Sequence, residues 1–167
     1  MIRSILFVCT GNTCRSIMAQ GMFKKMLKEK VENFYIYNIQ SAGISAISGM
    51  SPTSEATLVM LEQGIDISQH QAQPLRKELV KKANLILVMA NEHKEYIQKK
   101  FPFVQNKTFL LKKYALKNEF RNIPNNERDN EIIDPIGRPI EFYRIVSKEL
   151  KVKLEKIANI IIEENSR

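Results

Sequence analysis

The chain has 167 residues, which suits one domain with a substantial hydrophobic core, and we expect a single domain over residues 1–167. Apolar residues make up 44% of it and charged residues 26%, as in ordinary globular proteins. No stretch approaches the roughly 18 apolar residues of a membrane span, so we expect no membrane partner. The net charge of +8 is spread over scattered lysines without interleaved aromatic residues, which argues against nucleic acid as a partner.

Only two cysteines are present, Cys9 and Cys14, and both lie in one short segment. Two are too few for a disulfide scaffold and, alone, make a poor zinc site. A signal peptide is not expected either, because the apolar run 5–8 is too short and no small-residue cleavage site follows. We therefore expect a cytoplasmic protein in a reducing compartment, with no metal and no cofactor.

The first expected element is a buried strand over residues 5–8, where four branched or aromatic apolar residues follow one another. Residues 9–16 lack apolar bulk and lead into a helical pattern. In this segment Arg15 lies six positions after Cys9, and Ser16 follows. A thiolate can attack phosphorus, a guanidinium can bind two phosphate oxygens, and a helix N-terminus favours an anion. The segment therefore predicts a loop that holds a phosphoryl group above the Cys9 sulfur.

Two other interpretations of this segment are weaker. A small buried cysteine at a strand end with a solvated arginine nearby would carry no chemistry. The nucleotide-binding pattern Gly-x-x-x-x-Gly-Lys-Ser/Thr is absent, because Gly11 has neither the second glycine nor the lysine at the required positions. Nucleotide hydrolysis is therefore not expected.

Beyond the loop, helices and strands are expected to alternate. Apolar residues at helical spacing predict a helix to about residue 30, and an aromatic, β-branched segment predicts a strand over 34–40 that ends in a small-residue turn at 41–43. The remaining expected elements are a helix over 54–63 closed by Gly64, a short helix over 74–83, a strand over 85–89, a helix over 91–100, a strand over 108–111, and a long closing helix with its apolar stripe at Val146, Leu150, Leu154, Ile157 and Ile161.

This alternation predicts an α/β fold. We expect a single-domain three-layer sandwich in which a four-stranded parallel sheet is flanked by helices, with the phosphate loop after the first strand. Ligands of such sheets bind beyond the carboxyl ends of the strands, which is where Cys9 would lie.

Three polar features are interpreted from their surroundings. The Asn-rich segment 117–131 predicts a surface loop, longer than expected without a function. His93 lies at a polar helix start and is expected to face solvent. The hydroxyl of Ser16, at the mouth of the first helix, is expected to cap that helix.

The segment Cys9-Thr-Gly-Asn-Thr-Cys-Arg-Ser16 resembles the signature loop of the low-molecular-weight protein-tyrosine phosphatases, and most of all that of the bacterial branch with protein-arginine phosphatases. The resemblance runs from about residue 5 to the last helix. Its other motifs are Ser41-Ala-Gly43, Gly64-Ile-Asp-Ile-Ser-Gln-His70, Leu85-Ile-Leu-Val-Met89 and Asp134-Pro135.

The resemblance implies a protein phosphatase that works through a phosphocysteine, without a metal. Cys9, its pKa lowered from about 8.5 by the loop, the helix and a cation, would attack as a thiolate. Arg15 and the loop N–H groups would bind the phosphoryl oxygens, and Asp134 would protonate the leaving atom and then activate water. The residues expected to contact substrate are Thr10, Gly11, Asn12, Thr13, Cys14, Arg15 and Ser16.

The resemblance also implies supporting and redox roles. His70, Asn12 and Ser41 would form a network beneath the loop that holds Asn12 in a left-handed backbone conformation, and Ser16 would steady the Cys9 thiolate. Cys14 would trap oxidised Cys9 as a reversible disulfide. The strain of closing a bridge across so tight a loop opposes this pairing.

Implied substrates are phosphorylated proteins or peptides, implied inhibitors are phosphate and other oxyanions, and a monomer is expected. Thr13 favours phosphoarginine, because tyrosine-specific members often carry a bulky aliphatic residue at its position. Ile136 stands where both branches usually carry an aromatic wall, so it does not decide between the two substrates.

Three alternatives stay open. A strict tyrosine phosphatase would use the same loop. A thioredoxin-coupled arsenate reductase also would, but it needs cysteines after the loop and the chain has none beyond Cys14. A non-catalytic phosphoresidue-binding or redox module would need no proton donor, so Asp134 argues against it.

Overall fold

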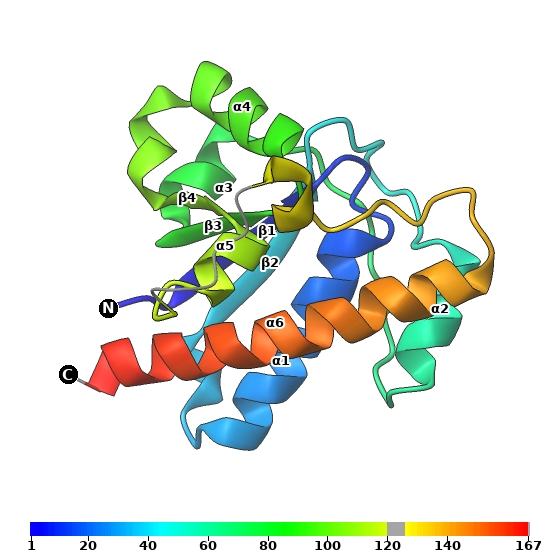
Figure 1. Cartoon of the computed structure of the whole chain (residues 1–167), viewed down its shortest axis with the longest axis horizontal. Helices are drawn as coiled ribbons and strands as arrows, with labels where there is room; N and C mark the ends of the chain where they lie inside the picture. Colours follow the sequence, from blue (N-terminus) through cyan, green and yellow to red (C-terminus); the bar gives the residue numbers. More distant parts are fainter. Residues whose placement is uncertain (120–125, 167) are drawn as a thin grey trace.

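A four-stranded parallel sheet forms the centre of the computed structural model, which describes residues 1–119 and 126–166 (Figure 1). Its strands are β1 (Ser4–Cys9), β2 (Asn38–Gly43), β3 (Leu85–Val88) and β4 (Thr108–Leu110), in the spatial order β2-β1-β3-β4. In the register, Cys9 lies opposite Gly43 of β2, and Val8 lies opposite both Ala42 of β2 and Val88 of β3. The strand order reverses between β1 and β3, so the loop after Cys9 lies at a topological switch point.

Helices cover both faces of the sheet, which confirms the expected three-layer α/β fold. The helical elements are α1 (Arg15–Lys30), η1 (Phe34–Ile36), α2 (Ser54–Leu61), α3 (Lys77–Lys82), α4 (Asn91–Lys100), η2 (Pro102–Lys107), α5 (Leu111–Ala115), η3 (Glu127–Asn130) and α6 (Ile140–Ser166), where η marks a 3-10 helix. Helices α1 and α6 lie on one face, with α3 and α4 on the other (Figure 1).

Strand β1 divides the core into two clusters, because successive side chains point to opposite faces of a sheet. Ile5 and Phe7 pack toward α1 and α6, where the Phe7 ring meets the Phe23 ring edge-on at 5.6 Å between centroids. Leu6 and Val8 pack toward α3 and α4. The predicted stripe of the closing helix is confirmed as buried, at Val146, Leu150, Leu154, Ile157 and Ile161.

The second strand begins later than the sequence predicted. Strand β1 starts at Ser4, whose partner is Asn38, so residues 34–37 have no strand to pair with. Residues 34–36 form η1 instead and leave Tyr35 exposed, despite their β propensity. The predicted turn at 41–43 was also wrong, because these small residues continue β2 and carry Gly43 to a position opposite Cys9.

Several other boundaries differ by a few residues. Helix α2 ends at Leu61, and a turn leads to Gly64, whose φ of 69° is left-handed. Helix α3 begins at Lys77, and the last strand gives way at Leu111 to the short helix α5, which was not predicted. Part of the predicted polar loop 117–131 lies outside the described residues.

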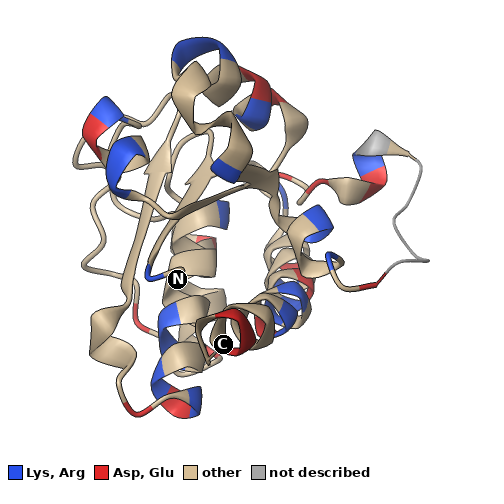
Figure 2. Cartoon of the chain, turned by 90° about the vertical axis from the view of Figure 1, so that its left-hand side faces the viewer, with Lys and Arg blue, Asp and Glu red and all other residues tan. Residues whose placement is uncertain are grey.

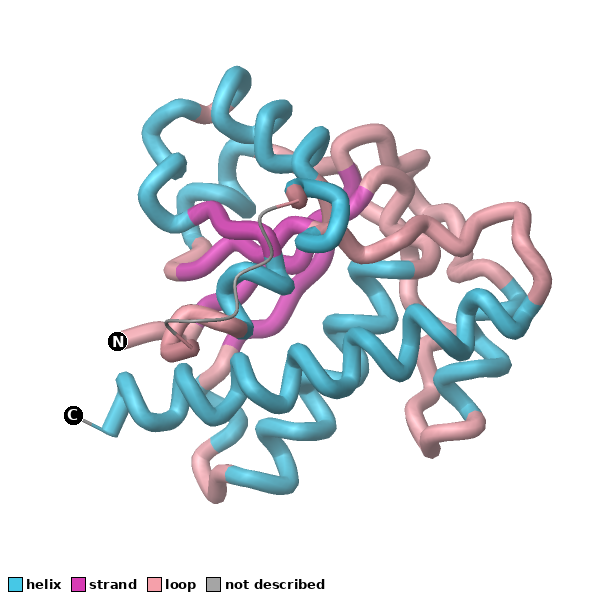
Figure 3. Tube along the Cα trace, viewed as in Figure 1, coloured by secondary structure: helices cyan, strands magenta, loops and turns pink. Residues whose placement is uncertain are grey.

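The loops that follow the strands gather at the carboxyl end of the sheet (Figure 3). The loop between β2 and α2 contacts the loop after β1 at two points: the Ser45 N–H donates to the carbonyl of Thr10 at 2.9 Å, and the Thr53 N–H donates to the carbonyl of Thr13 at 2.9 Å. This end of the sheet therefore brings distant segments together.

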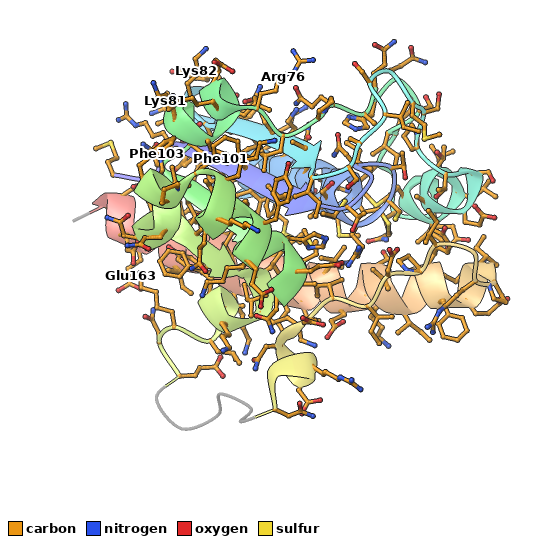
Figure 4. The ribbon with its side chains drawn as sticks, turned by 90° about the horizontal axis from the view of Figure 1, so that it is seen from above. Arg76, Lys81, Lys82, Phe101, Phe103 and Glu163 are labelled. Atoms are coloured by element: carbon orange, nitrogen blue, oxygen red, sulfur yellow. The ribbon has the colours of Figure 1, made fainter. Side chains whose placement is uncertain are left out.

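Charged side chains are dispersed over the outside of the molecule. Basic and acidic segments are interspersed along the helices (Figure 2), and Arg76, Lys81 and Lys82 point outward at α3 (Figure 4). Among residues 1–119 and 126–166, none of the helices combines the length and the apolar character needed to cross a bilayer.

Candidate active site

Cys9 ends β1, and residues 10–14 carry the chain into α1. The Cys9 sulfur lies 2.9 Å from the Ser16 hydroxyl oxygen and accepts the Asn12 backbone N–H at 3.3 Å. The N-terminus of α1, with its partial positive charge, is at the same place. These groups together favour an anion at and above the sulfur.

Asn12 is the central residue beneath the loop. Its φ of 58° is the left-handed conformation that the sequence predicted, and its side chain is fully buried. The amide nitrogen donates to Ser16 Oγ and to Ser41 Oγ, both at 2.8 Å. The amide oxygen accepts the Gln73 N–H at 3.0 Å and His70 Nε2 at 3.1 Å. All four hydrogen bonds that an amide can make are therefore formed, which locks the loop backbone.

This network leaves the Ser16 proton available to the Cys9 sulfur. Ser16 Oγ already accepts a bond from Asn12, so its own O–H is free to donate to the Cys9 sulfur. The expectation that Ser16 caps α1 was wrong, because Cys14 takes the N-cap position and no side chain caps the helix. A hydroxyl bonded to sulfur is the geometry needed to stabilise a thiolate.

Two glutamines extend the network and were missed in the sequence. Ser41 Oγ donates to the Gln20 side-chain oxygen at 2.6 Å, and the Gln73 side chain donates to the Ser41 carbonyl at 2.9 Å. Gln20 could have been found, since it lies one helical turn beyond Ser16. The half-buried His70 ring donates to Asn12 in its neutral form, because burial, and to a lesser extent the charge of Lys24, lowers its pKa.

Gly43 allows β2 to approach the loop. A Cβ atom at this position would lie 2.4 Å from the Thr10 carbonyl oxygen and 3.0 Å from the Asn12 nitrogen. The neighbouring Ile44 N–H bonds the Cys9 carbonyl at 3.0 Å. Only glycine fits this contact, which is a role that the sequence pattern did not reveal.

Arg15 is buried beside the loop, with its side chain 4% exposed. Its Nη1 donates to the Ile132 carbonyl at 3.1 Å, and its Nη2 donates to Asp134 Oδ2 at 3.1 Å and to Thr10 Oγ1 at 3.4 Å. Its Nε is buried without a hydrogen-bond partner among the described residues. An unpaired buried donor costs about 1–3 kcal/mol. Such a donor on a cation is suited to an oxyanion, which would supply the missing acceptor.

The predicted Asp-Pro loop places Asp134 against the phosphate loop. Its carboxylate accepts the Ile136 N–H at 3.2 Å and lies 3.8 Å from the Cys14 sulfur, in addition to its ion pair with Arg15. The side chain is 39% exposed, so it can also reach a group arriving from solvent. The structure therefore brings the three predicted catalytic residues, Cys9, Arg15 and Asp134, into one site.

Cys14 is a protonated thiol. Burial, and then the negative charges of Cys9 and Asp134, raise its pKa to about 12. Both cysteines are free, so the predicted Cys9–Cys14 disulfide is absent from this state. Within residues 1–119 and 126–166, no three side chains of His, Cys, Asp and Glu are grouped as metal ligands would be.

His93 does not face solvent as predicted, but is completely buried. Its Nδ1 accepts the Ala90 N–H at 3.0 Å, and its Nε2 lies 2.9 Å from Thr10 Oγ1. Burial, followed by the charge of Arg15, lowers its pKa to about 3. The spacing to the buried Ile97, four residues later on α4, was the available signal that this face turns inward.

The remaining predicted substrate contacts line the same loop. Thr13 is only 5% exposed, and its carbonyl ties the loop to the start of α2 through Thr53. A Cβ at Gly11 would make only an ordinary contact of 3.5 Å with Thr13 Oγ1. Ile136 is 57% exposed beside Asp134, at the rim of the site.

Comparisons with known proteins agree with this geometry. The family model described as "Low molecular weight phosphotyrosine protein phosphatase" matches residues 4–167. A protein-arginine-phosphatase of Geobacillus stearothermophilus is 36% identical over 154 residues, covering 92% of this chain and 93% of that protein. The low molecular weight protein-tyrosine-phosphatase Ptp of Acinetobacter johnsonii is 42% identical over 116 residues, covering 70% of this chain and 77% of that protein.

A solved structure of the YwlE arginine phosphatase is similar along the whole chain. It has a TM-score of 0.83 at 32% identity, and the match covers 95% of each chain. In that protein the active-site cysteine is mutated to serine, and the serine is phosphorylated. The predicted fold class and the resemblance carried by Cys9–Ser16 are thereby confirmed. This chain belongs to the low molecular weight phosphotyrosine protein phosphatase family.

Proposed function

We propose that this chain is a protein phosphatase that forms a phosphocysteine at Cys9 and acts on phosphoarginine in proteins or peptides. The observation that carries the proposal is the buried Nε–H of Arg15, for which the described part of the chain offers no acceptor. It belongs to the same loop as the Cys9 sulfur, and its guanidinium contacts Asp134. An oxyanion donor, a nucleophile and a carboxyl group in one site are the requirements of this reaction.

In the first step, Cys9 attacks phosphorus and the bond from phosphorus to the leaving nitrogen breaks. Arg15 and the N–H groups of residues 10–15 bind the three non-reacting oxygens, while the Ser16 proton stabilises the sulfur anion before attack and after its release. Preorganised donors of this kind contribute about 2.7–4 kcal/mol each to lowering the barrier.

Once released from Arg15, the Asp134 carboxylate takes up a proton from solvent, gives it to the leaving nitrogen, and then takes one from the water that hydrolyses the phosphocysteine. In the structure its carboxylate accepts a hydrogen bond from Arg15 Nη2. Incoming phosphoryl oxygens compete for that donor, and the displaced carboxyl group is then free to reach the leaving group. Binding of the substrate to Arg15 thus also releases Asp134 toward the leaving group.

Two observations support phosphoarginine over phosphotyrosine. The match to the Geobacillus arginine phosphatase extends over 92% of this chain, while the match to the Acinetobacter tyrosine phosphatase extends over 70%. Thr13 also places a hydroxyl in the loop, where Ile would fill the space and remove a hydrogen-bonding group.

The test compares kcat/KM for a phosphoarginine peptide and a phosphotyrosine peptide in the wild type and in Thr13→Ile. We expect the wild type to prefer phosphoarginine, and Thr13→Ile to reverse or abolish that preference. Thr13→Val, which keeps the shape but removes the hydroxyl, separates hydrogen bonding from volume. A preference that Thr13→Ile leaves unchanged contradicts the role of Thr13.

A strict tyrosine phosphatase is the second candidate, favoured by the 42% identity to the Acinetobacter protein. The exposed Ile136 does not decide between the two candidates, because without an aromatic residue there a tyrosine ring loses a stacking partner worth about 0.5–1.5 kcal/mol and a guanidinium loses a flat surface as well. Arsenate reduction lacks the cysteine that would have to follow Cys14 in the relay. A non-catalytic binding module would not require Asp134 beside the loop.

We extend the proposal to the setting of the enzyme. A nucleophilic thiolate requires a reducing compartment, and we propose the cytoplasm. The chain would act as a monomer. Free phosphate and similar oxyanions would inhibit it. Cys14 would resolve oxidised Cys9, but slowly, because burial raises the pKa of its thiol and leaves little attacking thiolate at neutral pH. Nucleic acid is not a proposed partner.

A further inference from the structure

His93 joins the carboxyl ends of two neighbouring strands at the switch point of the sheet. It lies in the first turn of α4, which follows β3, and its ring contacts Thr10, the first residue after β1. The ring is completely buried, and its two nitrogens have partners on different elements. No step of the proposed mechanism uses it.

The tautomer of His93 follows from its contacts. Nδ1 accepts the Ala90 backbone N–H at 3.0 Å, so the ring proton must be on Nε2, which donates to Thr10 Oγ1 at 2.9 Å. The Glu92 carboxylate lies 3.5 Å from the same nitrogen, but its side chain is 67% exposed and the Thr10 bond is shorter. His93 is therefore a fixed donor to Thr10.

Thr10 passes this constraint to Arg15. Its Oγ1 accepts both the His93 Nε2–H and, at 3.4 Å, Arg15 Nη2, which fills both lone pairs of the hydroxyl oxygen. Arg15 Nη2 has two hydrogens, and Asp134 takes the other. When Asp134 turns to the leaving group, Thr10 is the protein acceptor that stays on Nη2, as the Ile132 carbonyl stays on Nη1.

We propose that His93 is a positioning residue for the phosphoryl-binding arginine: through the Thr10 hydroxyl it holds the Arg15 guanidinium in its binding orientation after Asp134 has left it. This inference rests on the proposed function of the site. It predicts that losing the bond from His93 to Thr10 weakens oxyanion binding as well as turnover, without any contact between His93 and the phosphoryl group.

Two substitutions separate the two nitrogens of the ring. His93→Asn keeps an acceptor near Nδ1 for the Ala90 N–H but cannot reach Thr10, whereas His93→Gln keeps a donor near Nε2. The affinity for inorganic phosphate is measured from its protection of Cys9 against alkylation by iodoacetate, which needs no turnover. We expect His93→Asn to weaken phosphate binding about 3- to 10-fold, as for the loss of one ordinary hydrogen bond, and His93→Gln to recover most of that loss.

A double-mutant cycle tests whether His93 acts through Thr10. Thr10→Val alone should weaken phosphate binding to a similar extent, and His93→Asn should add little in the Thr10→Val background. Glu92→Gln is the matched control and should bind phosphate as the wild type does. Losses that multiply in the double mutant, or a Glu92→Gln protein that behaves like His93→Asn, overturn the proposal.

The same data distinguish this proposal from the proposed function. If the wild type hydrolyses neither phosphoarginine nor phosphotyrosine, but phosphate affinities follow the expected pattern, the proposed function fails and the role of His93 stands. If hydrolysis is found but neither His93 nor Thr10 substitutions change phosphate affinity, the role of His93 fails alone.

Discussion

Asp134 Oδ2 lies 3.1 Å from Nη2 of Arg15, although 119 positions separate the two residues in the chain. The carboxylate thereby occupies a guanidinium hydrogen that a phosphoryl oxygen would use. The Asp134 side chain is 39% exposed while that of Arg15 is 4% exposed, so an acceptor arriving from solvent can replace the carboxylate on the buried guanidinium. A bound phosphoryl group and the Asp134 carboxylate therefore compete for the same hydrogen of Arg15.

Removing this carboxylate should separate binding from chemistry. In Asp134→Ala we expect kcat to fall about 10²- to 10⁴-fold, as for loss of a general acid–base, because the leaving group is no longer protonated. Affinity for inorganic phosphate should stay the same or rise, because no carboxylate competes with phosphate for the Arg15 Nη2 hydrogen. Steady-state kinetics and phosphate protection of Cys9 measure the two quantities.

The control for that experiment is Asp129→Asn, which removes an exposed carboxylate five residues earlier and should change neither quantity. A clear loss of phosphate affinity in Asp134→Ala would mean that the carboxylate supports binding, contrary to the competition described above.

Gly43→Ala should distort the loop after β1, although Gly43 itself belongs to β2. The added methyl group would meet the Thr10 carbonyl oxygen at 2.4 Å, so the backbone of either β2 or the loop must move. We expect a large loss of phosphate affinity and a lower melting temperature. Gly49→Ala is the control, since its Cβ would meet nothing within 4 Å and only its left-handed φ of 83° opposes the change, at about 1–3 kcal/mol. Equal phosphate affinity in both variants would contradict the close-approach argument.

His93 should make the fold sensitive to acid. Its pKa is about 3 when folded and near 6.5 when unfolded, so the unfolded chain binds the proton more tightly. Stability from this group is present above pH 6.5 and is lost as the pH falls toward 3, by about 2 kcal/mol at pH 5. Urea unfolding of the wild type and His93→Gln at pH 7 and pH 5 measures it. The wild type should lose more free energy of unfolding, and equal losses would show that His93 is not buried in its neutral form.

Cys14 should resist alkylation, because its pKa of about 12 keeps it protonated at neutral pH and only the thiolate reacts. We expect iodoacetate at pH 7.5 to modify one cysteine in the wild type and in Cys14→Ser, and none in Cys9→Ser. Peptide mass spectrometry locates the modified residue. Rapid modification of Cys14 in Cys9→Ser would contradict its assignment as a buried thiol.

The parts of the fold and site that were predictable are local in the sequence. The Cys9–Ser16 segment contains its own nucleophile, cation and helix start, so its chemistry could be interpreted before its partners were known. The role of Asp134 came only from resemblance, because an Asp-Pro pair by itself is typical of a turn.

What the sequence did not reveal depends on packing between distant segments. The start of β2 is determined by where β1 begins to pair, and the inward orientation of His93 by how α4 packs on the loop after β1. Gln20 and Gln73 satisfy atoms of Asn12 and Ser41 that become buried only when the sheet is assembled. Periodicity can indicate which face of a helix turns inward, as Ile97 does for His93 and the turn after Ser16 does for Gln20, but it does not identify the atoms that this face meets.

Transfer of the phosphoryl group to Cys9 is the central claim, and trapping it is the most direct test. Asp134→Ala, mixed with a phosphoarginine peptide and quenched in acid at a series of times from milliseconds to minutes, should show by peptide mass spectrometry one added phosphoryl group on the peptide that contains Cys9. Cys9→Ala should show none under the same conditions. Substrate turnover by the wild type with no phosphoryl adduct on Cys9 in Asp134→Ala at any quench time would contradict the account.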